Sequence, residues 1–349
     1  MTRAPAKTRL GRGLTGIIFI VLLTGCGGAL LGLALQLFAA GAVVGNIDRL
    51  LDEFEEDPWE YQAFLDGYCL GERPNTSGDL NLRGLPTGSH LISVIHNNYH
   101  TGFHTVVQIN PGDTALPLGD INPIEGVAIK GKVQRQTTGT DASVPRTLVV
   151  AIFNGAEMLA ADGGGTIAIP PPDGVTYVMA YADAAGNYVL GPCISGQWLV
   201  TTVLPGYYAD ARIVTANRPN DNINQDLYLA TDPSAEAARV SGSVIRTGVG
   251  GLDEAFVYTE LTAAHRVQPT AARAAEIAAD AGFPLINGSW FAWSLLGTLT
   301  DQAGVYSMRT GTGLQTVTGF KYGYQGKQGA ANLQNGENLD NIDFDLPKA

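Results

Sequence analysis

The sequence predicts an all-β protein built from tandem antiparallel β-sandwich modules. Charged residues make up 15% of the 349-residue chain and 44 residues are glycine, whereas soluble domains average about 25% charged residues. Short alternating apolar runs are separated by Gly, Asn and Pro, a pattern typical of strands joined by tight turns. Because 45% of the residues are apolar, the chain has enough hydrophobic side chains to fold around a core.

The charges are distributed unevenly along the chain. Four bases lie before residue 13 and the first acid is Asp48, so the remainder carries all 33 acids with 17 of the 21 bases. Proteins that bind nucleic acid need a basic surface to meet the phosphates. We therefore expect no nucleic acid as a partner.

The N-terminus has the pattern of an export signal. A basic segment at 1–13 precedes an apolar run at 14–25 and then Cys26, the order found in cleaved secretory signals. The residues LTGC at 23–26 resemble the lipobox of bacterial lipoproteins. This resemblance implies a signal peptide over 1–26, with Cys26 lipidated and N-terminal after cleavage.

A membrane anchor is the alternative for the same region. Residues 14–45 contain no charged side chain, and about 20 apolar residues suffice to span a bilayer. The bases before this segment would keep an uncleaved N-terminus in the cytoplasm. Under either interpretation the chain from about residue 48 onward is exported and membrane-anchored in the cell envelope, on the periplasmic or surface side.

A short helical spacer is expected at 46–58. Its apolar residues recur three and four positions apart, which places them on one helical face, and Pro58 ends the pattern. These apolar residues are Ile47, Leu50, Leu51 and Phe54.

Three segments then repeat the same order of turns and strands. Each starts with an Asn or Asp three residues before a glycine, at Gly78, Gly186 and Gly304, which favours a turn closed by the Asn or Asp side chain. Alternating strands follow, and a second turn precedes a closing strand. Repetition of this unit predicts three related sandwiches.

The repeats set the expected module boundaries. The second module is expected at 125–231 and the third at 238–347, the third with an insertion at 265–298 that begins with a helical pattern. The first module, at 59–122, lacks the opening strand of the other two and is expected to be partial. Nine strand residues are expected in the cores: Val149, Ile152, Val189, Trp198, Val200, Val244, Val257, Tyr306 and Phe344.

Several motifs of the second and third modules resemble those of a known family. In the second these are VAIKGKV, YADAAGNYVL and NINQDLYL, and in the third VSGSVIR, LTDQAGVYSM and NIDFDL. They resemble the carboxypeptidase regulatory-like family, whose sandwiches are transthyretin-like (prealbumin-like). The resemblance implies accessory β-modules, found in envelope proteins and in some peptidases.

No motif of a known catalytic class is present. HExxH, a HxxE zinc pair, a Gly-x-Ser-x-Gly elbow, a P-loop and a strand–GxGxxG–helix unit are all absent from the sequence. We therefore expect a non-catalytic envelope lipoprotein without a cofactor, whose modules serve in binding or structural support. The alternatives are a metal-binding envelope protein and an accessory subunit of an envelope enzyme.

Two sets of residues are candidates for a binding site. Aromatic residues in loops suit stacking on carbohydrate or packing on a protein partner; they are Tyr99, Tyr207, Tyr208, Trp290, Phe291 and Trp293. The histidines His96, His100 and His104 flank an expected hairpin loop and are candidate metal ligands, although exposed hairpin histidines are the competing interpretation. Cys69 and Cys193 remain as either a disulfide or two separate thiols.

Overall fold

The structure is a computed structural model, and it describes residues 41–46, 58–110, 116–120, 123–135, 142–144, 146–153, 157–160, 166–169, 177–232, 237–260 and 295–349, with Ala272 and Ala275 singly. The chain divides into two units, Met1–Leu37 and Phe38–Ala349, and the described residues belong to the second. Cys26, the predicted signal peptide at 1–26 and most of the predicted spacer lie outside the described residues. Among the residues described, no helix is both long and apolar enough to cross a membrane.

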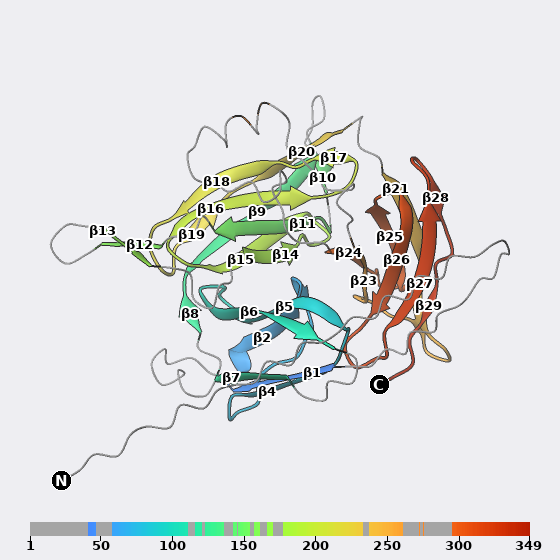
Figure 1. Ribbon diagram of the computed structural model, residues 1–349, viewed down its shortest axis with the longest axis horizontal. Coiled ribbons are helices and arrows are strands. Elements are labelled where there is room, and N and C mark those ends of the chain that lie inside the picture. The colour runs from blue at the N-terminus through green and yellow to red at the C-terminus, as the bar shows by residue number, and fades with distance from the viewer. Residues whose placement is uncertain are drawn as a thin grey trace, which may run out of the picture. The chain divides into compact units, whose positions relative to one another are not determined.

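The described elements are almost entirely β-strands (Figure 1), which confirms the predicted all-β class. One turn of 3-10 helix, η2 (Pro58–Glu60), precedes the second strand. Within the predicted helical insertion at 265–298, Ala272 and Ala275 are helical and exposed.

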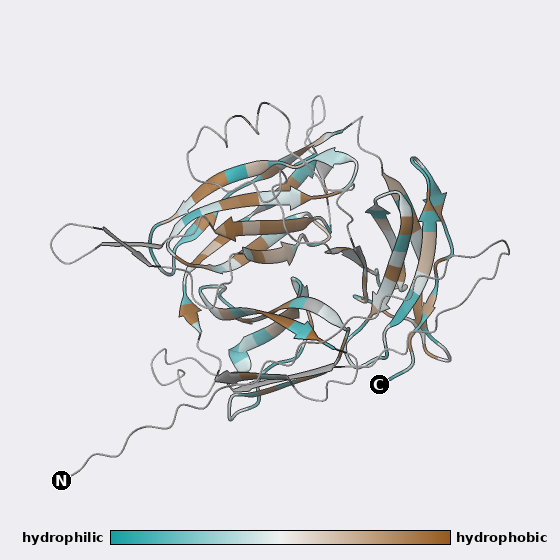
Figure 2. Ribbon diagram, in the orientation of Figure 1, coloured by the Kyte–Doolittle hydropathy of each residue, from teal (hydrophilic) through white to brown (hydrophobic). Residues whose placement is uncertain are grey.

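Module two is a sandwich of two sheets. In the first sheet, β9 (Val127–Arg135) opens the module; it pairs antiparallel with β15 (Asn187–Cys193) and parallel with two closing strands. The closing strands are β19 (Asn222–Asn224) and β20 (Leu227–Thr231). The second sheet comprises, in order, β14 (Tyr177–Tyr181), β11 (Leu148–Phe153), β16 (Gly196–Val203) and β18 (Ala211–Ala216). Figure 2 shows long hydrophobic stretches along the strands of this module.

Short strands complete module two. β10 (Ala142–Ser143) and β17 (Tyr207–Tyr208) extend the first sheet. β12 (Glu157–Ala160) and β13 (Thr166–Ile169) form a separate antiparallel hairpin.

Module three repeats this topology. Its opening strand β21 (Ala238–Arg246) pairs antiparallel with β25 (Val305–Thr310) and parallel with the closing strands. The closing strands are β28 (Asn338–Leu339) and β29 (Phe344–Asp345), and β22 (Gly250–Gly251) lies at the sheet edge. The second sheet comprises, in order, β24 (Leu295–Leu299), β23 (Phe256–Glu260), β26 (Gly313–Phe320) and β27 (Lys327–Leu333).

Module one has the same plan, and its opening strand is β1 (Gly41–Asn46). β1 pairs antiparallel with β4 (Asp79–Leu85) and parallel with β7 (Leu116–Asp120), as β9 and β21 do with their own partners. The opposite sheet comprises, in order, β3 (Tyr68–Cys69), β2 (Tyr61–Leu65), β5 (Gly88–His96), β6 (Thr101–Ile109) and β8 (Ile124–Glu125).

The prediction that module one lacks an opening strand is therefore wrong. The strand lies upstream of the expected boundary at residue 59, at the end of the apolar stretch 14–45. Residues 41–45, which the alternative membrane anchor also includes, belong to this strand.

A glycine in the opening strand of module two permits the close approach of the closing strand. Gly131 of β9 pairs with Tyr188 of β15, and a Cβ at residue 131 would lie 1.9 Å from the carbonyl oxygen of Gln225. The Tyr188 hydroxyl donates to that same oxygen at 2.5 Å. A glycine is thus required where the short segment between the two closing strands approaches the opening strand closely.

The other two modules carry a glycine at the same position. Gly242 pairs with Tyr306, and a Cβ there would lie 2.1 Å from the carbonyl oxygen of Ile342, which accepts the Tyr306 hydroxyl at 2.7 Å. In module one, Gly45 pairs with Leu80, two residues after the turn glycine, as Tyr188 and Tyr306 are in their modules. This equivalence supports the assignment of β1 as the opening strand.

The three predicted turns are confirmed. In each, one side-chain Oδ1 accepts two backbone N–H bonds of 2.8–2.9 Å, from the residues two and four positions later. The following glycine has φ between 75° and 83°, which a glycine adopts without a steric penalty. The turns begin at Asn75, Asp183 and Asp301 and contain Gly78, Gly186 and Gly304.

The modules share hydrophobic cores. Phe256, Tyr258 and Phe320 of module three pack in one cluster with the core of module one. A second cluster joins Leu91 of module one, Val150 of module two and Leu296 of module three. The modules therefore pack against one another as well as following one another in sequence.

Strand β5 shows the effect of this packing. All six residues of Leu91–His96 are buried, whereas a strand with one solvated face alternates between buried and exposed. Ile92 and Val94 face the core of module one, and Leu91 belongs to the cluster shared with the other modules. Both faces of β5 are thus covered.

The predicted core residues are largely confirmed. Seven of the nine are buried and lie in the cores of their modules; they are Val149, Trp198, Val200, Val244, Val257, Tyr306 and Phe344. Ile152 and Val189 are half-buried.

Candidate functional site

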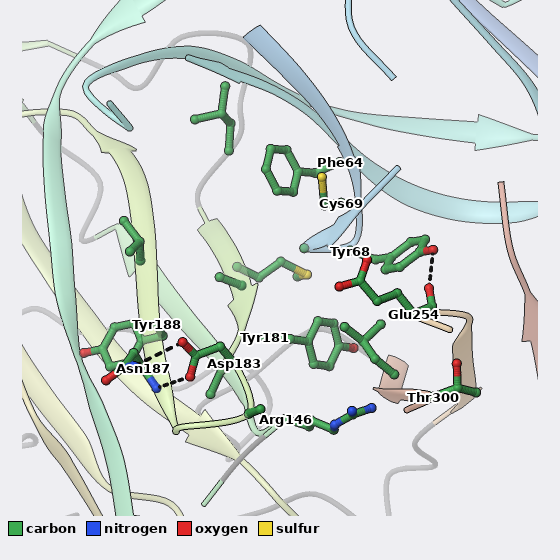
Figure 3. A pocket seen from close by; sticks show the side chains of 18 of the residues that line it. Phe64, Tyr68, Cys69, Arg146, Tyr181, Asp183, Asn187, Tyr188, Glu254 and Thr300 are labelled. Carbon is green, nitrogen blue, oxygen red and sulfur yellow. Dashed lines mark hydrogen bonds between the residues drawn. The ribbon is translucent and has the colours of Figure 1, made fainter. Parts of the chain in front are cut away.

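A cleft of about 590 Å³ opens between residues of all three modules (Figure 3). Module one contributes the β2–β3 hairpin with Phe64 and Tyr68, module two contributes Tyr181 and Asp183, and module three contributes Glu254. The volume falls within the range of about 300–1,000 Å³ that is usual for sites of small ligands. This three-module cleft is the candidate functional site.

Aromatic rings from all three modules meet beside the cleft. Tyr68 stacks on Phe256 with 5.1 Å between the ring centroids and 8° between the ring planes. Tyr181 meets the same ring edge-on at 5.5 Å and 66°. Such pairs contribute about 0.5–1.5 kcal/mol beyond their buried area. Phe256 therefore links the three modules beside the cleft.

Two hydroxyl groups at the cleft donate to backbone carbonyls. Tyr68 Oη donates to the carbonyl oxygen of Glu254 at 2.7 Å, and Thr300 Oγ1 donates to that of Leu252 at 2.6 Å. Burial, together with the charges of Cys69 and Glu254, raises the pKa of Tyr68. These hydroxyls stay protonated and serve as structural links.

The Asp183 turn forms one wall of the cleft. Asp183 Oδ2 accepts a 3.1 Å bond from Asn187 Nδ2 in addition to the two backbone bonds to Oδ1. Partial burial opposes ionisation, but the bonds from Asn187, Ala185 and Gly186 outweigh it and lower the pKa of Asp183. The carboxylate is therefore fixed in position and ionised at neutral pH.

Unusual backbone conformations gather in this cleft. Tyr99, Arg146 and Glu254 have φ values of 65°, 60° and 49°, and all three line the cleft. Among the described residues they are the ones with positive φ that are not Gly, Asn or Asp. A non-glycine residue held in this region costs about 1–3 kcal/mol, and such residues concentrate at functional sites.

The charges in the cleft are of both signs. Arg146 of module two and Glu254 of module three line it, and neither side chain makes an ion pair within the described part of the chain. Asp183, Asp253 and Asp301 also line it and are exposed. The cleft thus has an excess of negative charge with one half-buried guanidinium group.

The two described cysteines are separate free thiols. Cys69 lines the cleft and part of the residue is exposed to solvent. Its Sγ lies 3.4 Å from Gln62 Oε1, and the protein atoms around the thiol partly desolvate it, which is the main cause of its raised pKa. Cys193 is wholly buried, which raises its pKa. Because the nucleophilic form of cysteine is the thiolate, a raised pKa makes Cys69 a weak nucleophile.

The three predicted metal ligands do not come together. Within the described ranges, no three His, Cys, Asp or Glu side chains form a group that could hold a metal ion. His104 of β6 lies opposite Ser93 and its Nδ1 is 2.8 Å from Ser93 Oγ, while His96 Nε2 lies 3.1 Å from Glu60 Oε2. The strand register therefore separates these two histidines.

These histidines are also buried, contrary to the expectation of exposed hairpin side chains. His96, His100 and His104 are each less than a tenth exposed. The His96 ring packs edge-on against Tyr61 of the same module, whereas strand β6, which carries His104, contacts β15 of module two. Gly126 N donates to the carbonyl oxygen of His100. Burial lowers the pKa of His104 to about 4, so this side chain is neutral at physiological pH.

A buried ion pair lies in module one at the edge of this region. Asp66 Oδ2 is 2.6 Å from His90 Nδ1, and its Oδ1 accepts the backbone N–H of Leu91 at 2.8 Å. The two side chains are 1% and 3% exposed. Desolvation opposes protonation of His90, but the Asp66 carboxylate outweighs it and raises the pKa of His90.

Of the predicted aromatic contact residues, one lies in the cleft. Tyr99 lines it, whereas Tyr207 packs beneath the Arg309 guanidinium at 5.2 Å and is buried in module two, and Tyr208 is half-buried in the short strand β17. Trp290, Phe291 and Trp293 lie outside the described residues.

Sequence reasoning missed most of the cleft. Phe64, Arg146, Asp183 and Glu254 lie far apart in the chain, and their proximity depends on packing between modules. One local signal was present, since Asp183 starts a turn recognised from the sequence and Asp301 starts the equivalent turn. That signal identifies the two turns and not their convergence.

Comparison with known proteins gives distant structural likenesses. No protein-family model matches the chain, and no curated protein matches it. The Bacillus anthracis TIE protein is 10% identical with a TM-score of 0.21, over 88% of this chain and 51% of that one, so the chain spans about half the length of that protein. A streptococcal ancillary pilin is 8% identical with a TM-score of 0.24, over 89% and 99% of the two chains. The major pilin subunit of Bacillus cereus is 10% identical with a TM-score of 0.21, over 89% and 99%.

Proposed function

We propose that the protein is a non-catalytic, membrane-anchored envelope lipoprotein whose three β-sandwich modules act together in binding or structural support. The observation that carries the proposal is the shared packing of the modules. Phe256 of module three sits in the core of module one and contacts rings from the other two modules. Such packing suits a rigid body that presents one composite surface.

The chemistry of the cleft supports a non-catalytic role. The hydroxyls of Tyr68 and Thr300 are engaged with backbone carbonyls, and the Cys69 thiol has a raised pKa. A nucleophilic mechanism needs a hydroxyl or thiol activated by an adjacent base. The Tyr68 hydroxyl instead links module one to module three, and the Thr300 hydroxyl bonds within module three.

The proposed localisation in the cell envelope rests on the N-terminal sequence. The basic segment, the apolar run and the LTGC lipobox support export and lipidation at Cys26. The proposal also takes the modules as carboxypeptidase regulatory-like sandwiches, on the motifs VAIKGKV and VSGSVIR that lie in the opening strands β9 and β21.

The mass of the intact protein from membranes of its own host tests this function. A species that begins at Cys26 and carries a diacylglyceryl group is the expected result, and Cys26→Ser is expected to abolish both cleavage and lipidation. A full-length protein with an unmodified Cys26 would contradict the lipoprotein assignment. It would favour an uncleaved membrane anchor.

A further inference from the structure

We propose that the three-module cleft binds a small zwitterionic ligand of dipeptide size, with its carboxylate at Arg146 and its ammonium group at Glu254. The inference deepens the binding role proposed above and rests on it in that respect. It does not depend on how the chain is anchored.

The first step is the separation of two opposite charges within one cavity. Arg146 and Glu254 belong to different modules and both line the cleft, yet no ion pair joins them or links either to another described residue. Figure 3 shows the Arg146 side chain extending through the cleft toward Thr300, away from the acidic turn at Asp183. A ligand with charges at its two ends can pair with both side chains at once.

The second step is the balance of charge around the cavity. Four carboxylates, those of Asp183, Asp253, Glu254 and Asp301, line the cleft with a single guanidinium group, that of Arg146. A ligand with negative charge alone would be repelled by the four carboxylates, so the observations favour one that also carries a cation. A planar carboxylate is the partner that fits the forked donors of an arginine.

Apolar surface lines part of the same cleft. Phe64, Tyr99 and Tyr181 are half-buried and line the cleft. Aromatic side chains of this kind pack against an apolar or aromatic ligand group and attract a nearby cation. The volume of about 590 Å³ accommodates a ligand with one aromatic side chain.

The backbone conformation at three residues of the cleft also favours a binding role. Both charged residues and Tyr99 have positive φ, although a glycine at any of these positions would relieve the strain. The side chains at these positions therefore oppose local stability. A binding role accounts for their presence, since strained residues concentrate where a ligand is held.

Titration calorimetry on the full chain, extracted in detergent, tests the ligand class. The probes are glycyl-phenylalanine and two blocked derivatives. The N-acetyl derivative lacks the positive charge, and the C-terminal amide lacks the negative charge. Saturable binding of the free dipeptide and at least about tenfold weaker binding of both blocked forms are expected. Equal binding of either blocked form, or no saturable binding up to about 10 mM, would overturn the proposal.

Substitutions locate the binding in the cleft. Arg146→Gln and Glu254→Gln are each expected to weaken dipeptide binding at least about tenfold. Arg218→Gln and Glu125→Gln are matched controls, because both residues are exposed and neither lines the cleft. Unchanged binding in the two cleft variants, or equal losses in the controls, would refute the site.

A further variant separates loss of binding from loss of folding. Arg146→Gly removes the guanidinium group and also relieves the positive-φ strain, so Tm is expected to stay the same or rise while binding is lost. Retained binding in this variant would refute the role of Arg146. Failure of these experiments leaves the mass measurement at Cys26 unaffected, so the two proposals fail separately.

Discussion

Replacement of Gly131 by alanine tests the close approach of opening and closing strands. A Cβ at this position would lie 1.9 Å from the Gln225 carbonyl oxygen and 2.6 Å from its carbonyl carbon. Real Cβ atoms essentially never come within 3.0 Å of such an atom, so the closing strand must retreat by about 1.1 Å, the difference between 3.0 and 1.9 Å. The substitution therefore moves backbone and not the end of a flexible side chain.

The expected loss follows from the contacts that this shift disturbs. Overpacking of a filled interior costs about 1–3 kcal/mol. The shift also stretches the Tyr188 hydroxyl bond to Gln225 and the backbone bond from Gln225 N to Lys130 O, which measure 2.5 and 2.7 Å, each worth about 1 kcal/mol. We expect Gly131→Ala to lower the free energy of unfolding by about 3 kcal/mol.

Equilibrium urea unfolding of the full chain measures this loss, with Gly329→Ala as the matched control. A Cβ at residue 329 would meet Ile342 Cγ2 at an ordinary 3.6 Å, and alanine in a strand is favoured over glycine by about 0.5–1 kcal/mol. The control is therefore expected to be neutral or slightly stabilising. If Gly131→Ala costs no more than the control, the close approach of Gln225 does not require a glycine at residue 131.

Three further outcomes are expected. Burial lowers the pKa of His104 to about 4, below the unfolded value of about 6.5, so its contribution to stability is complete above pH 6.5 and is lost as the pH falls toward 4. His104→Asn should flatten this pH dependence, which spans about 3 kcal/mol in urea titrations. An unchanged pH profile would contradict the argument. The pH dependence contributed by His90 has the opposite sign, since Asp66 raises the pKa of His90. Asp66→Asn should lower the free energy of unfolding by about 3 kcal/mol below pH 6.5 and by progressively less as the pH rises through the folded pKa of His90. A loss of stability independent of pH would refute the ion pair. Deletion of residues 41–46 should expose module one to limited proteolysis before the other modules; protection equal to that of the full chain would show that β1 is dispensable.

Local patterns made the turns and most of the strands predictable. An Asn or Asp followed three residues later by glycine specifies its own hydrogen bonds, so the turns at Asn75, Asp183 and Asp301 follow from sequence. Alternation of apolar residues likewise marks the cores of modules two and three. Both signals are complete within a few neighbouring residues.

Strand β1 was missed because its apolar composition fits a membrane-spanning segment as well as a strand. Its apolar residues continue an uncharged stretch long enough to span a membrane, and that length concealed the strand pattern. The signal was nonetheless present: VVGNI at 43–47 matches IKGKV at 129–133 and VSGSV at 240–244, each with a glycine at its centre. Alignment of the opening strands on this glycine, and not on the turns, finds it.

Burial of His104 and formation of the cleft depend on packing between modules. Alternation along a strand reports one covered face and cannot report that a neighbouring module covers the other, as happens at Leu91–His96. For the same reason His104 looked exposed from the sequence. The cleft residues Phe64, Arg146 and Glu254 are brought together by contacts between sheets that no local pattern encodes.

The parallel pairing of opening and closing strands determines how each module responds to a pulling force. In all three modules the first strand and a final strand run side by side in the same direction. Tension on the two ends of a module therefore loads this pair lengthwise, and its hydrogen bonds must break together and not one after another. A chain tethered at one end and held by a partner at the other would resist extension through these strands.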